Sequence, residues 1–266
     1  MFNNHLNQQK KDAAKPRPIF TLENVSVHFD KHAIRQRSLK TMLGQALRGG
    51  QREQVEALRH INLTIREGEQ VGLIGRNGAG KSTLLRVVTG VIFPQSGMVK
   101  ISHARHIVPL LELGIGFQPD LSGRENCILA GIIMGYRKAE IEARMESIIA
   151  FSELGDFIDE PVKHYSSGMY ARLAFAIATD VRPDVLVVDE VFGVGDEFFM
   201  RKCTARMQQL MDMGRTTIFV SHNLDYLLTQ CSRLIWLDRG LIVRDGDPLE
   251  VAEAYRGEMF VRSEAL

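Results

Sequence analysis

One stretch of eight residues constrains this chain more than any other. Residues 75–82 match the phosphate-loop pattern G-x-x-x-x-G-K-[ST]. An apolar run at 70–74 precedes the loop, and a helical pattern over 81–89, ended by Gly90, follows it. Glycines let the chain curl so that backbone N–H groups point at phosphate oxygens, and the helix start adds its positive end. The sequence therefore predicts a strand–loop–helix unit that binds phosphate groups.

Individual roles within the loop follow from this geometry. Lys81 is expected to reach the β- and γ-phosphates of a nucleotide, and the Ser82 hydroxyl to ligate Mg²⁺. The expected nucleotide-binding residues are Gly75, Arg76, Asn77, Gly78, Ala79, Gly80, Lys81, Ser82 and Thr83. A phosphate loop alone does not distinguish GTPases, nucleotide kinases and transport ATPases, so the class must come from other residues.

A second apolar run, at 185–188, ends in two acidic residues, Asp189 and Glu190. In open α/β sheets ligands bind beyond the carboxyl ends of the strands, so these carboxylates are expected beside the phosphate loop. Asp189 is suited to hold Mg²⁺ or its waters, and Glu190 is suited to orient an attacking water.

Strand and helix patterns alternate along most of the chain. Helices are expected at 122–136, 139–154, 168–179, 197–213 and from 248 to about 256, the first of them opened by a capping box at Ser122 and Glu125. Strands are expected at 19–29, 70–74, 185–188 and 216–220, with a hairpin at 234–243. This alternation predicts an α/β fold with a parallel sheet.

Composition limits the remaining possibilities. The chain has 266 residues, with 33 Lys and Arg against 32 Asp and Glu, and the net charge of +1 argues against a dedicated nucleic-acid binder. No uncharged apolar run approaches the ~18 residues of a membrane span. Residues 1–18 are expected to form a flexible polar tail without a secretory signal. Three widely spaced cysteines indicate a reducing, cytosolic compartment.

The pentapeptide Tyr-Ser-Ser-Gly-Met at 165–169 resembles the Leu-Ser-Gly-Gly-Gln signature of ATP-binding-cassette (ABC) ATPases. Ser166 supplies a hydroxyl, Gly168 permits close backbone approach and a helix is expected to begin here, which together make a second phosphate cradle. Ser167 and Met169 depart from the family pattern. The resemblance implies that these four residues act in trans, on the γ-phosphate bound by another copy. Standing alone, they would indicate an ordinary serine-capped helix.

Two more positions match the same family. Asp196 stands where the family has its D-loop aspartate, although the preceding D-loop residues differ, and His222 matches the switch histidine that bonds the γ-phosphate. The resemblance covers most of residues 19–250. It implies a phosphate-loop NTPase cassette with a RecA-like parallel core, an antiparallel β lobe and a helical signature subdomain at about 120–182. It also implies an ATPase that uses ATP and Mg²⁺, with Glu190 and His222 as catalytic residues.

Two family positions have competing interpretations. The Q-loop residue is either Glu112, by strict spacing, or Gln118, the only glutamine nearby. The aromatic residue that stacks on adenine would be Phe29, which could equally be part of the core.

Residues 31–52 hold six basic residues and no acidic one, and their apolar residues fall at helical spacing. We expect a basic amphipathic helix within an insertion at 31–55. It either contacts the anionic membrane surface, a permease or a lipid-linked phosphate head group, or packs on the β lobe with its charges solvated.

Residues 111–126 and 164–175 resemble the branch of ABC ATPases that exports polysaccharides. The resemblance implies a homodimer that closes on ATP and drives a separate integral membrane permease. The cargo would be a lipid-linked, O-antigen-like polysaccharide, or alternatively a capsular polymer, a teichoic acid or another lipid-linked glycan. The chain would lie peripherally on the cytoplasmic face of the inner membrane. Its cassette is expected at 19–258, with a tail at 259–266 and no separate sugar-binding domain.

Three rival functions explain less of the sequence. A phosphate-loop kinase leaves the Ser166 and His222 motifs unexplained. A soluble ABC protein of translation or DNA repair usually carries tandem cassettes or long coiled-coil insertions, which do not fit in 266 residues. A non-catalytic binding module does not need Glu190 and His222 together.

Overall fold

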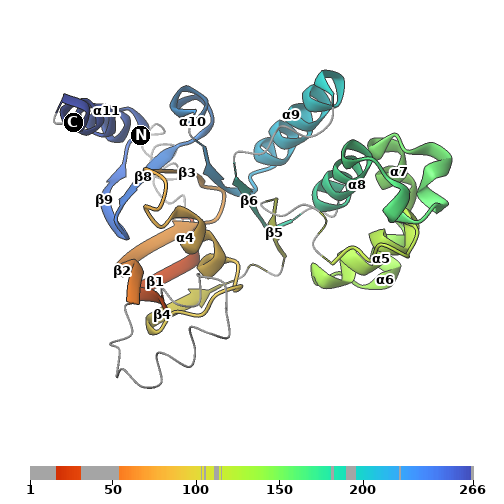
Figure 1. Ribbon diagram of the computed structural model, residues 1–266, viewed down its shortest axis with the longest axis horizontal. Helices are drawn as coiled ribbons and strands as arrows, with labels where there is room; N and C mark the ends of the chain where they lie inside the picture. The colour runs from red at the N-terminus through yellow and green to blue at the C-terminus, as the bar shows by residue number, and fades with distance from the viewer. Residues whose placement is uncertain are drawn as a thin grey trace, which may run out of the picture.

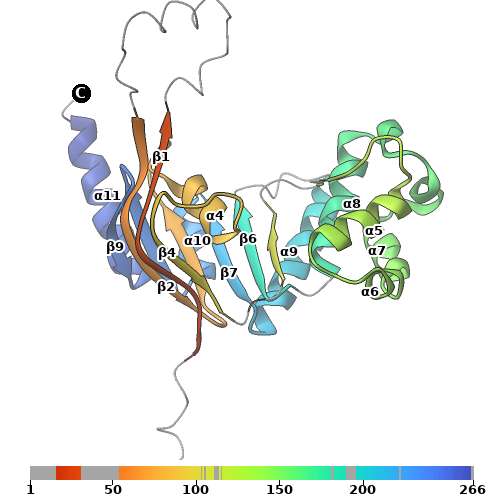
Figure 2. The same ribbon diagram turned by 90° about the horizontal axis from the view of Figure 1, so that it is seen from below.

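The described chain consists of two β-sheets, helices that cover the larger sheet, and an arm of further helices (Figures 1 and 2). The computed structural model describes residues 16–30, 54–102, 104, 106–110, 114, 116–180, 183–189, 196–221 and 223–264. No helix in these ranges is both long enough and apolar enough to cross a membrane.

The larger sheet carries the parallel core that the sequence predicts. Its strand order is β5-β6-β7-β3-β8-β9. The strands are β3 (Gln70–Ile74), β5 (Ile107–Pro109), β6 (Val185–Asp189), β7 (Thr216–Val220), β8 (Arg233–Asp238) and β9 (Leu241–Gly246). Neighbours from β5 to β8 pair in parallel, and only β9 is antiparallel. Every residue of β7 is buried, as expected for a central strand covered on both faces.

The smaller sheet is the predicted antiparallel lobe, with strand order β2-β1-β4. It comprises β1 (Pro18–Asp30), β2 (Gln54–Arg66) and β4 (Ser96–Ile101). Strands β1 and β2 pair over most of their length on either side of residues 31–53. The helix predicted there lies outside the described residues. Strand β2 begins at Gln54.

Helices cover both faces of the larger sheet. Helix α4 (Lys81–Val88) shares one core cluster with β1, β2 and β3 and with one side of β6, β7 and β8. Helices α9 (Glu197–Asp212), α10 (Leu224–Gln230) and α11 (Pro248–Glu264) contribute to a second cluster on the other side. Helix α11 continues past the expected end near Arg256 and runs to Glu264. Gly257 does not end the helix, since an interior glycine costs only about 1 kcal/mol.

The helical arm lies at one end of the sheet, beside α9 (Figure 1). It contains α5 (Gly123–Ile133), α6 (Lys138–Glu142), α7 (Met145–Ser152), α8 (Ser167–Asp180) and the 3-10 turns Gly155–Asp159 and Val162–His164. The prediction of a single helix at 139–154 is wrong, because the helix is interrupted at Ala143 and Arg144. There the Arg144 guanidinium donates to the Asp180 carbonyl at 2.8 Å, a bond from a distant part of the sequence.

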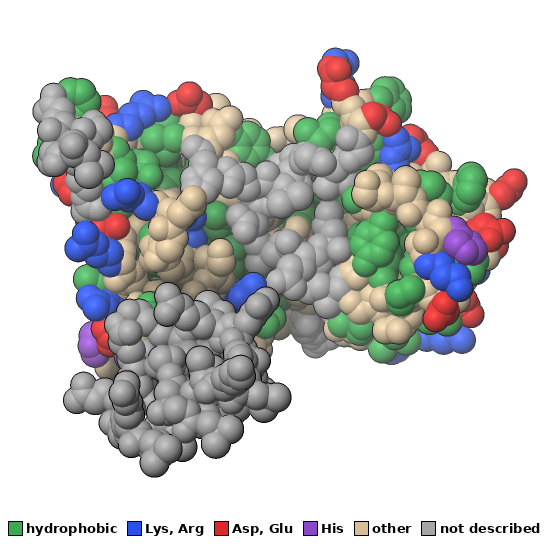
Figure 3. All heavy atoms as spheres, in the orientation of Figure 1, with side chains coloured by type: hydrophobic (Ala, Val, Ile, Leu, Met, Phe, Trp, Pro, Cys, Tyr) green, Lys and Arg blue, Asp and Glu red, His purple; other side chains and the backbone are tan. Residues whose placement is uncertain are grey.

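Acidic and basic side chains are interspersed over the arm (Figure 3). Several form exposed ion pairs, such as Arg124 with Asp159 and Lys163 with Asp120. Exposed pairs contribute ~0–1 kcal/mol each. The arm is therefore held mainly by its apolar core, which it shares with α9 and the larger sheet.

Candidate functional site

The phosphate loop joins β3 to α4, as the sequence predicts. Arg76, Asn77 and Gly78 are exposed, whereas Ala79 and Lys81 are buried. The Ala79 amide donates to the Arg76 carbonyl at 3.1 Å and so closes the turn. The loop therefore presents its central residues to solvent while its end is anchored in the core.

Two of the loop glycines face backbone atoms of neighbouring elements. A Cβ on Gly75 would lie 2.2 Å from the Leu237 carbonyl oxygen, and one on Gly80 would lie 2.6 Å from that of Ala57. Both glycines adopt positive φ angles, of 148° and 109°. Glycine is thus required here both by conformation and by space.

The Lys81 ammonium group bends back over its own loop. Its Nζ atom donates to the carbonyl oxygens of Gly75 at 2.6 Å and Arg76 at 3.1 Å. A buried ammonium group needs such partners. Ser82, in the first turn of α4, is exposed, and Thr83 is half-buried. The first turn thus combines a cation, a free helix start and an exposed hydroxyl, the features that bind phosphate.

The sheet register brings the end of β6 level with the end of β3. Asp189 pairs with Val220 of β7, and Val220 pairs in turn with Leu73, just before the phosphate loop. Two strand spacings amount to about 10 Å, so the backbone of Asp189 lies beside the phosphate loop at the carboxyl edge of the sheet. The Asp189 side chain, Glu190 and His222 lie outside the described residues.

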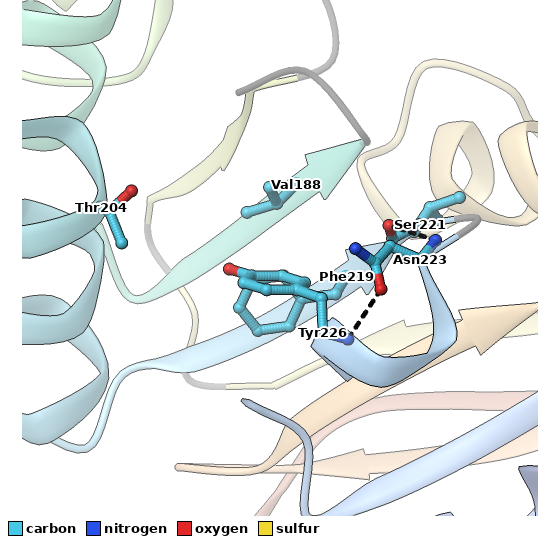
Figure 4. A pocket seen from close by; sticks show the side chains of 7 residues that line it. Val188, Thr204, Phe219, Ser221, Asn223 and Tyr226 are labelled. Carbon is cyan, nitrogen blue, oxygen red and sulfur yellow. Dashed lines mark hydrogen bonds between the residues drawn. The ribbon is translucent and has the colours of Figure 1, made fainter. Parts of the chain in front are cut away.

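A pocket of about 280 Å³ lies over the last residues of β6 and β7, between them and the helices α9 and α10 (Figure 4). It is lined by Val188, Thr204, Phe219, Val220, Ser221, Asn223 and Tyr226. Asn223 caps α10 by accepting a hydrogen bond from the Tyr226 amide at 3.0 Å. Val188 and Phe219 belong to the core cluster on the α9 side of the sheet, whereas α4 packs on the other side.

The second predicted phosphate cradle stands at the start of α8. The Ser166 hydroxyl accepts the Met169 amide at 3.1 Å, so the serine caps this helix. Ser166 and Ser167 are exposed, and Gly168 and Met169 are half-buried. A Cβ on Gly168 would meet only Ser166 Oγ, at 3.8 Å, and otherwise open space. The helix start is therefore accessible to a ligand or to another chain.

Asp196 caps α9, a role that the sequence analysis did not assign to it. Its Oδ1 atom accepts the Phe199 amide at 2.9 Å, and its Oδ2 atom accepts a hydrogen bond from Arg172 of α8. The bond from the Phe199 amide, helped by the charge of Arg172, lowers the pKa of Asp196. The carboxylate therefore stays ionised at neutral pH.

The two Q-loop candidates differ in how far the structure describes them. Glu112 lies outside the described residues. The backbone of Gln118 is bound in both directions by Asn126, and its side chain is exposed. Tyr170 of α8 was not singled out from the sequence, yet its hydroxyl donates to the Gly114 carbonyl at 2.9 Å. Burial raises the pKa of Tyr170, which keeps this donor protonated.

Phe29 is half-buried and packs on the core cluster below the smaller sheet. It pairs with Val55 of β2, two residues from Ala57, which borders Gly80 of the phosphate loop. This position suits either interpretation of Phe29, as an adenine contact or as core.

The residues around the loop also fit Mg²⁺, which prefers oxygen ligands and retains several waters. The exposed Ser82 hydroxyl provides such an oxygen, and the backbone of Asp189 lies at the same edge of the sheet. In the described part of the chain, no group of three or more His, Cys, Asp or Glu side chains is arranged to hold a metal ion.

The parallel sheet and the phosphate loop at its carboxyl edge define an α/β protein of the phosphate-loop NTPase class. The sequence model described as ABC transporter matches residues 58–193. The chain belongs to the ABC transporter family.

Several curated relatives share much of this sequence. The O-antigen export system ATP-binding protein RfbB of Myxococcus xanthus is 49% identical over 241 residues, which cover 88% of this chain and 55% of that protein. A protein of the same name from Klebsiella pneumoniae is 46% identical over 76% of this chain and 82% of its own length. The teichoic acids export ATP-binding protein TagH of Listeria innocua is 42% identical over 75% of this chain and 58% of its own length. The chain thus spans little more than half the length of the Myxococcus and Listeria relatives.

Solved structures share the fold. An ATP-binding subunit of an ABC transporter aligns with a TM-score of 0.70 at 20% identity, covering 92% of this chain and 98% of that chain. A dimeric ATP-binding cassette bound to ADP and phosphate aligns with a TM-score of 0.66 at 23% identity, covering 86% and 98%. These likenesses establish the cassette fold.

Proposed function

We propose that this chain is the ATP-hydrolysing subunit of an ABC exporter of lipid-linked polysaccharide. The observation that carries the proposal is that one chain has two separate candidate phosphate-binding sites, here called cradles. One is the phosphate loop at the carboxyl edge of the parallel sheet, and the other is the exposed, serine-capped start of α8. In Figures 1 and 2 the arm with α8 lies apart from α4, so one copy does not bring the two cradles together.

ATP binds with its phosphates on residues 75–83. Lys81 exchanges its carbonyl partners for phosphate oxygens, which compensate its buried charge better than neutral carbonyls do. Ser82 and Asp189 would hold Mg²⁺, which would supply positive charge to offset that of the phosphates. Glu190 orients the attacking water, and His222 contacts the γ-phosphate.

A second copy completes each site. Ser166 and Gly168 of that copy close over the γ-phosphate, so that two chains bury two ATP molecules between them. The exposure of both cradles supports this arrangement. Closing on ATP and reopening after hydrolysis drive an integral membrane permease, and the chain lies peripherally on the cytoplasmic face of the inner membrane.

The cargo is proposed from the relatives. Proteins named for O-antigen export match this chain at 49% and 46% identity, and one named for teichoic acid export matches at 42%. An O-antigen-like polysaccharide on a lipid carrier is therefore the first candidate, with a teichoic acid or another lipid-linked glycan as the alternative.

Lys81→Ala tests both parts of the proposal. In the purified chain, we expect loss of Mg²⁺-dependent phosphate release from ATP by at least about a hundredfold, the scale of a lost electrostatic contact to the transferred group. Lys100→Ala is the matched control, because Lys100 lies on the smaller sheet and, among the described residues, forms an exposed pair with Glu23. Equal activity of wild type and Lys81→Ala would refute the proposal that this chain hydrolyses ATP at its phosphate loop.

The export step needs a cellular measurement. Cells that lack this chain should lose surface polysaccharide and retain the lipid-linked polymer inside, and wild type but not Lys81→Ala should restore export. Unchanged surface polysaccharide in the deletion strain would refute the proposed cargo but would not bear on the proposed ATP hydrolysis. Loss of a teichoic acid or capsule instead would identify the alternative cargo.

A further inference from the structure

The pocket over the last residues of β6 and β7 has apolar walls (Figure 4). Val188 and Phe219 come from the two strands, and the Tyr226 ring of α10 stands edge-on to Phe219, with 6.0 Å between the ring centroids. None of the described residues that line the pocket is charged. An ionic ligand would find no counter-charge there, so the pocket suits an uncharged, apolar group.

The polar atoms of the lining are engaged in local hydrogen bonds. The Thr204 hydroxyl donates to the Met200 carbonyl of its own helix at 3.0 Å. Ser221 Oγ accepts the Asn223 amide at 3.0 Å, and the Asn223 side chain accepts the Tyr226 amide. Small-molecule sites usually measure ~300–1,000 Å³. A pocket of about 280 Å³ with engaged polar atoms therefore suits a single apolar side chain better than a larger ligand.

A short stretch of the chain joins the two elements that border this pocket. Strand β6 ends at Asp189, next to Val188, and α9 is capped by Asp196. Residues 190–195 lie outside the described residues, and Phe192 is the one aromatic residue in their sequence. An extended chain spans at most ~3.6 Å per residue, so the Cα atom of Phe192 lies within about 11 Å of that of Asp189. Covalent connection alone keeps the Phe192 ring near the pocket.

We propose that Phe192 fills this pocket and is the positioning residue that holds Glu190 at the ATP site. Glu190 directly follows Asp189, whose backbone lies at the carboxyl edge of the sheet. A strand fixes the chain on one side of Glu190, and a buried ring two residues later fixes it on the other. Phe198, in the first turn of α9, is 71% exposed and does not line the pocket. The inference rests on the proposed function, since Glu190 orients water only in an ATPase.

Benzene is a probe for the occupant, because a dry apolar cavity of sufficient size binds it. In ligand-observed NMR on the purified chain, we expect Phe192→Ala to bind benzene and wild type not to bind it. Adding Thr204→Trp, which places a ring at the pocket from an exposed position of α9, should abolish that binding. Ala205→Trp, at the exposed neighbouring position, is the matched control and should leave it intact. Equal binding by wild type and Phe192→Ala, or no binding by either, would overturn the inference.

The kinetics of ATP hydrolysis test the positioning of Glu190. Phe192→Ala should lower kcat by about ten- to a hundredfold, because a misplacement of about 1 Å costs up to this much. The Kd for ATP should be unchanged, since the phosphate loop is untouched. Phe192→Leu, which remains large and apolar, should recover much of the loss. In the otherwise wild-type chain, Thr204→Trp should lower kcat by excluding the Phe192 ring, whereas Ala205→Trp should not.

Two kinetic results would overturn the inference. One is wild-type kcat in Phe192→Ala, and the other is a loss of ATP affinity that matches the loss of kcat, which indicates a general structural role. If wild type itself hydrolyses no ATP, the proposed function fails instead. Benzene binding still reports in that case whether Phe192 fills the pocket, so the two failures are distinguished.

Discussion

At the scale of single residues, the conformation of the phosphate loop depends on glycines at positions where a side chain would be strained or would clash. Gly78 and Gly80 both have positive φ angles, of 79° and 109°. A Cβ on Gly78 would meet nothing within 4 Å, whereas one on Gly80 would strike the backbone of β2 at Ala57. The two positions therefore share a conformational requirement but differ in their steric one.

This difference predicts unequal costs for the same substitution. Gly78→Ala should lower the free energy of unfolding by about 1–2 kcal/mol, the cost of left-handed backbone for an L-residue. Gly80→Ala should lower it by about 2–5 kcal/mol, because an overpacking cost of similar size is added. Urea denaturation of both variants beside wild type measures the difference. Equal losses would mean that β2 moves freely away from the loop.

At the scale of elements, Asn126 connects the segment before α5 to the helix itself. It is fully buried. Its side chain accepts the Gln118 amide at 2.7 Å and donates to the carbonyls of Gln118, Leu121 and Ser122 at 2.9 to 3.1 Å. The same helix starts with the predicted capping box between Ser122 and Glu125. The side-chain amide of Asn126 thus holds residues 118–122 against the start of α5.

Removal of that amide should loosen the arm. Asn126→Leu leaves the Gln118 amide without its partner, whereas the three carbonyls each keep a backbone donor. One unsatisfied group costs about 1–3 kcal/mol, so we expect a loss of about 1–3 kcal/mol in unfolding free energy. Asn126→Asp keeps the acceptor for the Gln118 amide but loses the donor to three carbonyls, and should also destabilise. Hydrogen exchange should locate the loosening at residues 118–126. Wild-type stability of Asn126→Leu would contradict this role.

Sequence analysis succeeds here where the determinants are local. The strand, loop and helix at 70–88 and the capping box at Ser122 follow from neighbouring residues, and both are confirmed. Strand β4 escapes prediction because it is an edge strand with most residues exposed, and β5 because it has only three residues. The contacts of Arg144 with Asp180 and of Arg172 with Asp196 join residues far apart in the sequence, which periodicity cannot identify.

At the scale of the whole molecule, the phosphate loop and the capped start of α8, the two cradles, lie in different parts of the fold. The phosphate loop is built into the junction of the two sheets, where Gly240 of the β8–β9 turn bonds both Ala79 and Arg59 of β2. The capped start of α8 stands on the arm, apart from α4 in both views (Figures 1 and 2). This separation suits a site that is completed only when two copies meet.

The most direct test of this account is the oligomeric state of Glu190→Gln with ATP and Mg²⁺. Loss of the carboxylate that orients water should stop hydrolysis while ATP binding persists, so the closed state accumulates. Sedimentation velocity should show a monomer without nucleotide and a dimer at saturating ATP. Adding Ser166→Arg, which places a bulky side chain at the open start of α8, should abolish that dimer. A Glu190→Gln chain that binds ATP yet remains monomeric at saturation would contradict the shared-site account.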